Sequence, residues 1–208
     1  AYYPSRVNAY MPAQTEEGQI PVPIFRMLGS DPIYQYDDGL GQERQGVISL
    51  EPVYEKAGMD RRWVDYFLES IVDQPCLAFN YAQAGQENSF TWSNMSKGLE
   101  MQIPILDSLR KENKIRVETL GESGAWFKEC FKVTPATAVT TLTDVRGEGN
   151  KTVWFNSRYY RGDLLWEKGT FRFRDIHLFD ESYKSVYLEK PGDGNQFLFY
   201  TLPVVDGF

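Results

Sequence analysis

Two glutamates, Glu51 and Glu118, are the residues of this sequence best suited to acid–base chemistry. Each lies at or near the end of a short apolar run, residues 47–51 and 115–119, that we expect to form a strand. Two carboxyl groups that face each other across a cleft can hydrolyse a glycosidic bond, one as acid and the other as nucleophile or base. We therefore predict a catalytic pair. The alternative is that each glutamate is a solvated strand-end acid or the ion-pair partner of a nearby arginine.

Aromatic, amide and acidic side chains follow the expected strands, where a parallel sheet collects its functional groups. Aromatic rings stack on flat ligands such as sugar rings, and amides and carboxylates hydrogen-bond hydroxyl groups. The residues that we predict to contact a substrate in these ways are Tyr34, Tyr36, Asp37, Asp38, Tyr81, Gln83, Gln86, Trp92, Glu122 and Trp126. The simpler alternatives are that the aromatic side chains fill the core and that the two aspartates belong to a turn.

The sequence offers little for metal or cofactor chemistry. It has a single histidine, His177, whereas histidine zinc sites and the HExxH motif need at least two. We expect His177 to be a strand residue with a structural hydrogen bond. Cys76 and Cys130 lack the spacing of metal ligands, so we expect both to be small buried residues. Because the phosphate-binding glycine motifs are also missing, we predict no metal and no cofactor.

Three apolar runs, residues 47–51, 76–81 and 115–119, alternate with two amphipathic segments long enough to be helices. Asp60 is placed to cap the first helix, which should end by Gln74 because Pro75 follows it. Strand, helix and strand at this spacing are typical of parallel crossover units.

From about residue 133 the pattern changes to short strands separated by glycine, asparagine and aspartate turns, which indicates antiparallel pairing. We therefore predict an α/β protein. Its residues 1–145 form parallel β/α units of a partial TIM-like barrel, and residues 146–208 form an antiparallel β-rich region packed on or following it.

Composition narrows the possible partners. The chain has 208 residues, a net charge of -7 and scattered lysines and arginines, which argues against nucleic acid as a partner. No apolar run approaches the ~20 residues of a membrane-spanning helix, so we expect no membrane span. The first residues contain neither an initiator methionine nor a secretory apolar core. We expect a mature chain or an excised piece of a longer protein.

The strand ending at Glu51 and Pro52, the run 115–120 followed by residues 121–127, and the change to a β-rich tail resemble a known architecture. They are similar to the later half of a (β/α) barrel from secreted bacterial carbohydrate-active proteins, either glycoside hydrolases or polysaccharide-deacetylase-like barrels. The resemblance covers about residues 20–145. It implies a carbohydrate partner and a secreted or periplasmic location after removal of a signal peptide. Deacetylase-like barrels hold a metal with an aspartate and two histidines, and this chain has one histidine. The alternatives to a hydrolase are a non-catalytic carbohydrate-binding module and a scaffold portion of a larger enzyme.

Overall fold

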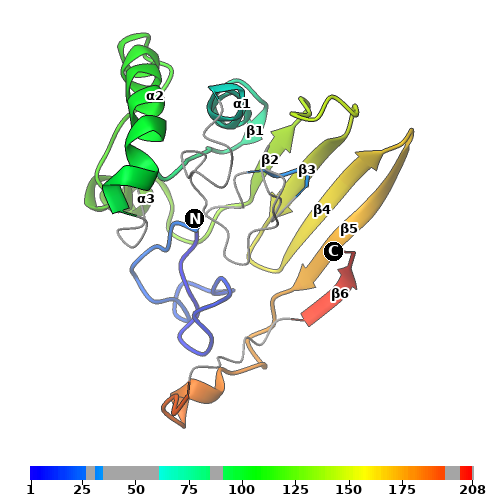
Figure 1. The fold of residues 1–208 in the computed structure, drawn as a ribbon. Coiled ribbons are helices and arrows are strands. Elements are labelled where there is room, and N and C mark those ends of the chain that lie inside the picture. The colour runs from blue at the N-terminus through cyan, green and yellow to red at the C-terminus, as the bar shows by residue number, and fades with distance from the viewer. Residues whose placement is uncertain (27–30, 35–60, 85–90, 195–201, 208) are drawn as a thin grey trace.

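The fold is built on one six-stranded antiparallel sheet, in which every strand pairs with its neighbour in the chain (Figure 1). The computed structural model describes residues 1–26, 31–34, 61–84, 91–194 and 202–207. The strands are β1 (Cys76–Leu77), β2 (Thr137–Thr141), β3 (Lys151–Asn156), β4 (Tyr160–Glu167), β5 (Thr170–Leu178) and β6 (Leu202–Asp206). The helices lie together on one side of this sheet (Figure 1).

The predicted parallel β/α units and partial TIM-like barrel are wrong. The run 76–81 contributes only the two residues of β1, which pair antiparallel with β2, and residues 115–119 are not a strand. Strands of a parallel sheet are buried on both faces, whereas Leu77 is 47% exposed and Val117 is 61% exposed. The remaining run, residues 47–51, lies outside the described residues. The antiparallel pairing expected of the last third is present, and the division near residue 145 stays a prediction.

In the described part of the chain, three α-helices accompany the sheet: α1 (Arg61–Val72), α2 (Thr91–Lys111) and α3 (Leu120–Cys130). The expected helix after Asp60 is confirmed as α1, and its apolar stripe packs against α2 through Val64, Phe67 and Leu68. Within the region expected to contain only short strands, the 3-10 helix Val186–Leu188 follows β5. Cys76 and Cys130 are exposed and unbonded, so the expectation that both are buried is wrong.

A capping box explains why residues 115–119 lead into a helix. The backbone N–H of Glu122 donates to Thr119 Oγ1 at 3.3 Å, and the backbone N–H of Thr119 donates to Glu122 Oε2 at 2.7 Å. Each side chain thereby satisfies one of the free backbone donors at the start of α3. The hydrogen bonds from Thr119 hold the pKa of Glu122 below its usual value. Glu122, predicted to contact a substrate, is thus occupied by its own helix.

Removal of this cap should have a measurable cost. We expect Thr119→Ala to lower the free energy of unfolding by about 0.5–2 kcal/mol, because the capping oxygen is lost. Urea denaturation measures the change, with Thr119→Ser as the matched control that keeps the hydroxyl. Equal stability of the two variants would contradict the capping role.

The face of the sheet turned toward the segment 31–34, the inner face, is buried. Trp154, Asp163 and Asp175 are direct partners on β3, β4 and β5 and therefore lie in one row on this face. Trp154 Nε1 donates to the carbonyl oxygen of Pro32 at 2.9 Å. This row connects the sheet to a segment more than a hundred residues earlier in the chain.

Charged groups on the inner face pair with one another. Arg174 is the extra residue of a β-bulge opposite Asp163 and Leu164, and its buried guanidinium forms an ion pair with Asp163. The guanidinium also donates to the carbonyl oxygen of Pro32 at 3.0 Å. Burial raises the pKa of Asp163, while the Thr152 hydroxyl and the Arg174 charge oppose this shift.

His177, in β5, lies on the same face beside a second buried aspartate, Asp175. Its Nδ1 lies 2.6 Å from Asp175 Oδ1, and the Nε of Arg161 lies 2.6 Å from Asp175 Oδ2. His177 is therefore a strand residue with structural contacts, as its isolation in the sequence indicated.

Candidate ligand-binding site

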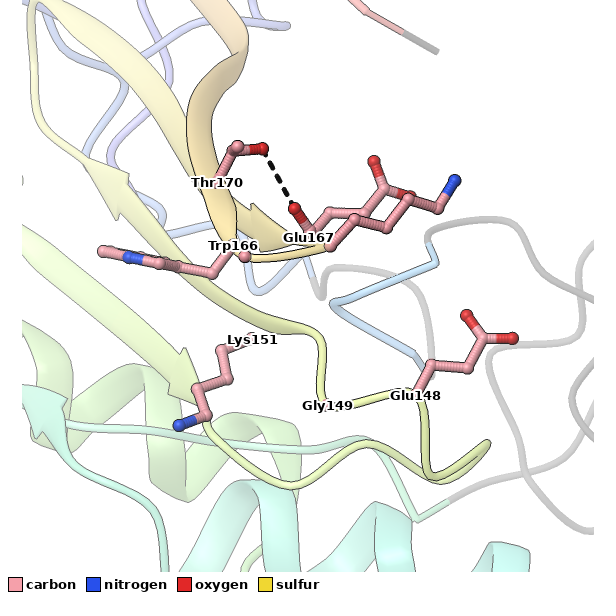
Figure 2. Close-up of a pocket in the computed structure, with 8 residues that line it drawn as sticks. Glu148, Gly149, Lys151, Trp166, Glu167 and Thr170 are labelled. Atoms are coloured by element: carbon pink, nitrogen blue, oxygen red, sulfur yellow. Dashed lines mark hydrogen bonds between the residues drawn. The ribbon is translucent and has the colours of Figure 1, made fainter.

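A cavity of about 240 Å³ lies where the loop between β2 and β3 meets the turn between β4 and β5 (Figure 2). Its lining residues are mainly charged or polar and include one tryptophan: Glu148, Gly149, Lys151, Trp166, Glu167, Lys168, Gly169 and Thr170. Pockets for drug-sized ligands occupy about 300–1,000 Å³. The cavity is smaller than these and suits a single ring with polar substituents.

The β4–β5 side of the cavity is a tight hairpin. Lys168 and Gly169 both have positive φ, 52° and 79°, as the two central residues of a type I′ turn require. Thr170 Oγ1 donates to the carbonyl oxygen of Glu167 at 3.0 Å across this turn (Figure 2). Pairing of β4 with β3 places Trp166 opposite Lys151, so an indole ring and an ammonium group lie on neighbouring strands.

The β2–β3 side of the cavity is a loop organised by Asp144. Its carboxylate accepts backbone N–H groups from Arg146 at 2.8 Å, Glu148 at 3.2 Å and Asn150 at 3.1 Å. Between these donors the chain turns through Gly147 at φ 72°, a conformation that favours glycine. The loop is thereby fixed by one side chain and presents Glu148 at the cavity.

Tyr34, a predicted site residue, supports this loop from the adjoining segment. Its hydroxyl lies 2.8 Å from Asp144 Oδ2 and 3.1 Å from Glu148 Oε2, and Asn150 Nδ2 donates to it at 3.0 Å. Burial, and then the hydrogen bond with Asp144, raise the pKa of Tyr34, so the hydroxyl keeps its proton and donates. The guanidinium of Arg146 lies 4.3 Å from the centre of the Tyr34 ring. Tyr34 therefore positions Glu148 and is not itself part of the lining.

The segment that carries Tyr34 is held by α1. Asp31 Oδ1 accepts the backbone N–H of Ile33 at 2.9 Å and the hydroxyl of Tyr66 at 3.1 Å. The Tyr66 ring stacks on Trp63 with centroids 5.4 Å apart, and Val145 of the β2–β3 loop packs against both. A continuous set of contacts thus runs from the helix to the cavity wall.

Three other predicted site residues, Glu118, Glu122 and Trp126, lie in or next to α3, away from this lining. Ser123 Oγ donates to Glu118 Oε2 at 2.9 Å, and Arg116 Nε lies 3.3 Å from Glu118 Oε1. Trp126 makes an edge contact with Phe79 at 5.2 Å and lies under the guanidinium of Arg116. Glu118 is therefore paired with an arginine, which was the alternative to its catalytic role.

The remaining predicted residues are dispersed. Tyr81 stacks on Phe79 at 6.0 Å and donates its hydroxyl to the carbonyl oxygen of Arg26, while Gln83 is exposed. Trp92, at the start of α2, is 65% exposed. The other predicted residues lie outside the described part of the chain, and their roles stay predictions: Glu51, Tyr36, Asp37, Asp38 and Gln86.

Sequence reasoning missed the lining residues themselves. The signal that could have found them is the run 164–173, in which a lysine–glycine pair separates a mainly apolar stretch from one that alternates polar and aromatic residues. That pattern is typical of a β-hairpin, and a tryptophan beside its turn is placed at the sheet end.

No protein-family model, curated protein or solved structure matches this chain. Within the described ranges, no helix is both long and apolar enough to cross a membrane. Likewise, no group of three or more histidine, cysteine, aspartate or glutamate side chains among the described residues is arranged to hold a metal ion.

Proposed function

We propose that this chain is a non-catalytic carbohydrate-binding module whose sugar site is the cavity between the β2–β3 loop and the β4–β5 turn. The observation that carries the proposal is a hollow sized for one ring, lined by the indole of Trp166, by Lys151 on the neighbouring strand and by the acidic residues of the adjoining loop and turn. Sugar rings combine apolar C–H faces with a rim of hydroxyl groups, so they need both kinds of contact. A secreted or periplasmic location belongs to the same proposal.

Each lining residue has a role in this scheme. Trp166 is 39% exposed, and its ring supplies the flat platform for the sugar. Phe171 lies beside it, with centroids 5.9 Å apart, and supports its orientation. The carboxylates of Glu148 and Glu167 accept hydrogen bonds from sugar hydroxyls, and the ammonium group of Lys151 donates to them.

Binding is favoured over hydrolysis because the fold removes the basis of the hydrolase assignment. That assignment placed Glu51 and Glu118 at the common rim of a parallel barrel, and the sheet is antiparallel. Glu118 instead forms contacts with Ser123 and Arg116 near the start of α3. The glycoside-hydrolase assignment is therefore withdrawn, and the binding alternative takes its place.

The proposal predicts that binding depends on one indole ring. We expect the protein to retain members of a glycan array. For a retained oligosaccharide, we expect Trp166→Ala to weaken the affinity at least about tenfold, or roughly 1.4 kcal/mol. Isothermal titration calorimetry measures the affinity, with Trp92→Ala as the matched control that removes an exposed indole elsewhere. Failure to retain any glycan, or equal affinity in the two variants, would contradict the proposal.

A further inference from the structure

The face of the sheet opposite the inner face, here called the outer face, is apolar and exposed. Its residues come from β3, β4, β5 and β6, at the positions that alternate with those of the inner face. The apolar side chains on this face are Val153, Phe155, Tyr160, Leu164, Phe171, Phe173, Ile176, Leu178, Leu202 and Val205, and Trp166 lies at its margin beside the cavity. Among these positions no side chain is charged, and Lys151 lies at the margin beside Trp166.

Strand register makes this surface continuous. Val153, Leu164 and Phe173 are direct partners in one row across three strands, and Trp166 pairs with Phe171 in the adjacent row. On the other side of the row formed by Val153, Leu164 and Phe173, Ile176 pairs with Val205. Among the described elements, the helix–strand contacts join α1 to β2, which contributes none of these residues.

The exposed area is that of a large apolar patch. Phe171 is 64% exposed, Phe173 54%, Leu178 44% and Tyr160 43%. With about 150–250 Å² per aromatic side chain, the three aromatic residues among them expose roughly 300 Å² of side-chain surface, to which Leu178 adds. The half-buried members of the face add to this, toward the ~800 Å² per partner of a standard interface. Monomeric proteins rarely expose a contiguous apolar patch of more than a few hundred Å².

We propose that the outer face is a homodimer interface, in which two copies of the chain pack sheet against sheet as a β-sandwich. The contact runs from Phe171 to Leu178 and leaves Trp166, at the margin of the face, open to the cavity. A second copy fits because its outer face is equally uncharged, whereas the rest of a chain with net charge -7 repels its own copy. A two-fold axis through the face brings each apolar row against the same surface of the partner.

The sheet edge offers a poorer contact than the face. β6 forms one edge, and it contains Pro203, which lacks a backbone N–H, together with a register shift beside Ile176 and His177. Proline and bulges on an edge strand oppose pairing with another chain. Association through the face is therefore the arrangement that the sheet supports.

Sedimentation velocity of the whole chain tests this interface. We expect the wild-type protein to sediment as a dimer at micromolar concentration, and Phe173→Glu and Leu178→Glu each to sediment as monomers. Both residues are exposed, so the variants keep the fold, as far-ultraviolet circular dichroism verifies. Val117→Glu is the matched control, since Val117 is 61% exposed near α3 and its variant should remain dimeric.

Two results would overturn the interface: a wild-type monomer up to about 1 mM, the weak end of specific association, or a dimer that both outer-face variants retain. The result does not depend on the proposed sugar site, because neither Phe173 nor Leu178 lines the cavity.

Discussion

Asp163→Ala should lower the free energy of unfolding by about 3–5 kcal/mol, because it leaves a buried guanidinium without its carboxylate. Asp163 and Arg174 are both buried and form an ion pair on the inner face. The Thr152 hydroxyl also donates to Asp163, and it too would lose an acceptor. Urea denaturation followed by circular dichroism measures the loss.

Asp65→Ala is the matched control for this substitution. Asp65 pairs with Arg61 at 2.8 Å on the exposed side of α1, and exposed ion pairs contribute about 0–1 kcal/mol. We also expect Asp163→Leu combined with Arg174→Met to recover part of the lost stability, since no charge then remains unpaired. Equal losses for Asp163→Ala and Asp65→Ala would show that the inner face is open to solvent.

Trp154→Ala should cost about 3–5 kcal/mol, the range for removing a large buried aromatic side chain. Trp154 is buried on the inner face and donates its indole N–H to the carbonyl oxygen of Pro32. Its loss therefore creates a cavity and also removes a contact between the sheet and the segment 31–34. Thermal and urea unfolding both report this change.

Trp92→Ala is the comparison for this second substitution, because the same residue type is removed from an exposed position. Surface substitutions usually change stability by less than about 0.5 kcal/mol. A large loss in Trp92→Ala together with a small loss in Trp154→Ala would reverse the assignment of core and surface.

Local patterns in the sequence predicted local structure well. The amphipathic segment after Asp60 indicated α1, and the change after residue 133 to short strands separated by turns indicated the antiparallel pairing of β2 to β5. The arrangement of the elements could not be obtained in this way. Short apolar runs such as residues 76–81 and 115–119 are equally compatible with a parallel strand, a short edge strand or a segment that leads into a helix. What decided between them was pairing with β2 and the cap formed by Thr119 and Glu122.

The candidate site was predicted less well for the same reason. The sequence singled out residues after expected parallel strands, so it found Tyr34, which supports the loop, and missed Glu148 and Trp166. These two residues are 18 positions apart, and both line the cavity only because the β3–β4 hairpin returns the chain to the same end of the sheet. Hairpin pairing, rather than position after a strand, places the chemistry here.

The most direct test of the proposed sugar site is an NMR titration that observes the indole N–H signals of the five tryptophans in one spectrum. When an oligosaccharide that the wild-type protein retains is added, we expect a concentration-dependent shift of the Trp166 signal. Trp166→Ala identifies this signal, because the variant lacks it. The signals of buried Trp63 and Trp154 and of exposed Trp92 should stay in place. A shift of the Trp92 or Trp126 signal without a shift of the Trp166 signal would contradict sugar binding at Trp166, and so would a spectrum in which no tryptophan signal moves.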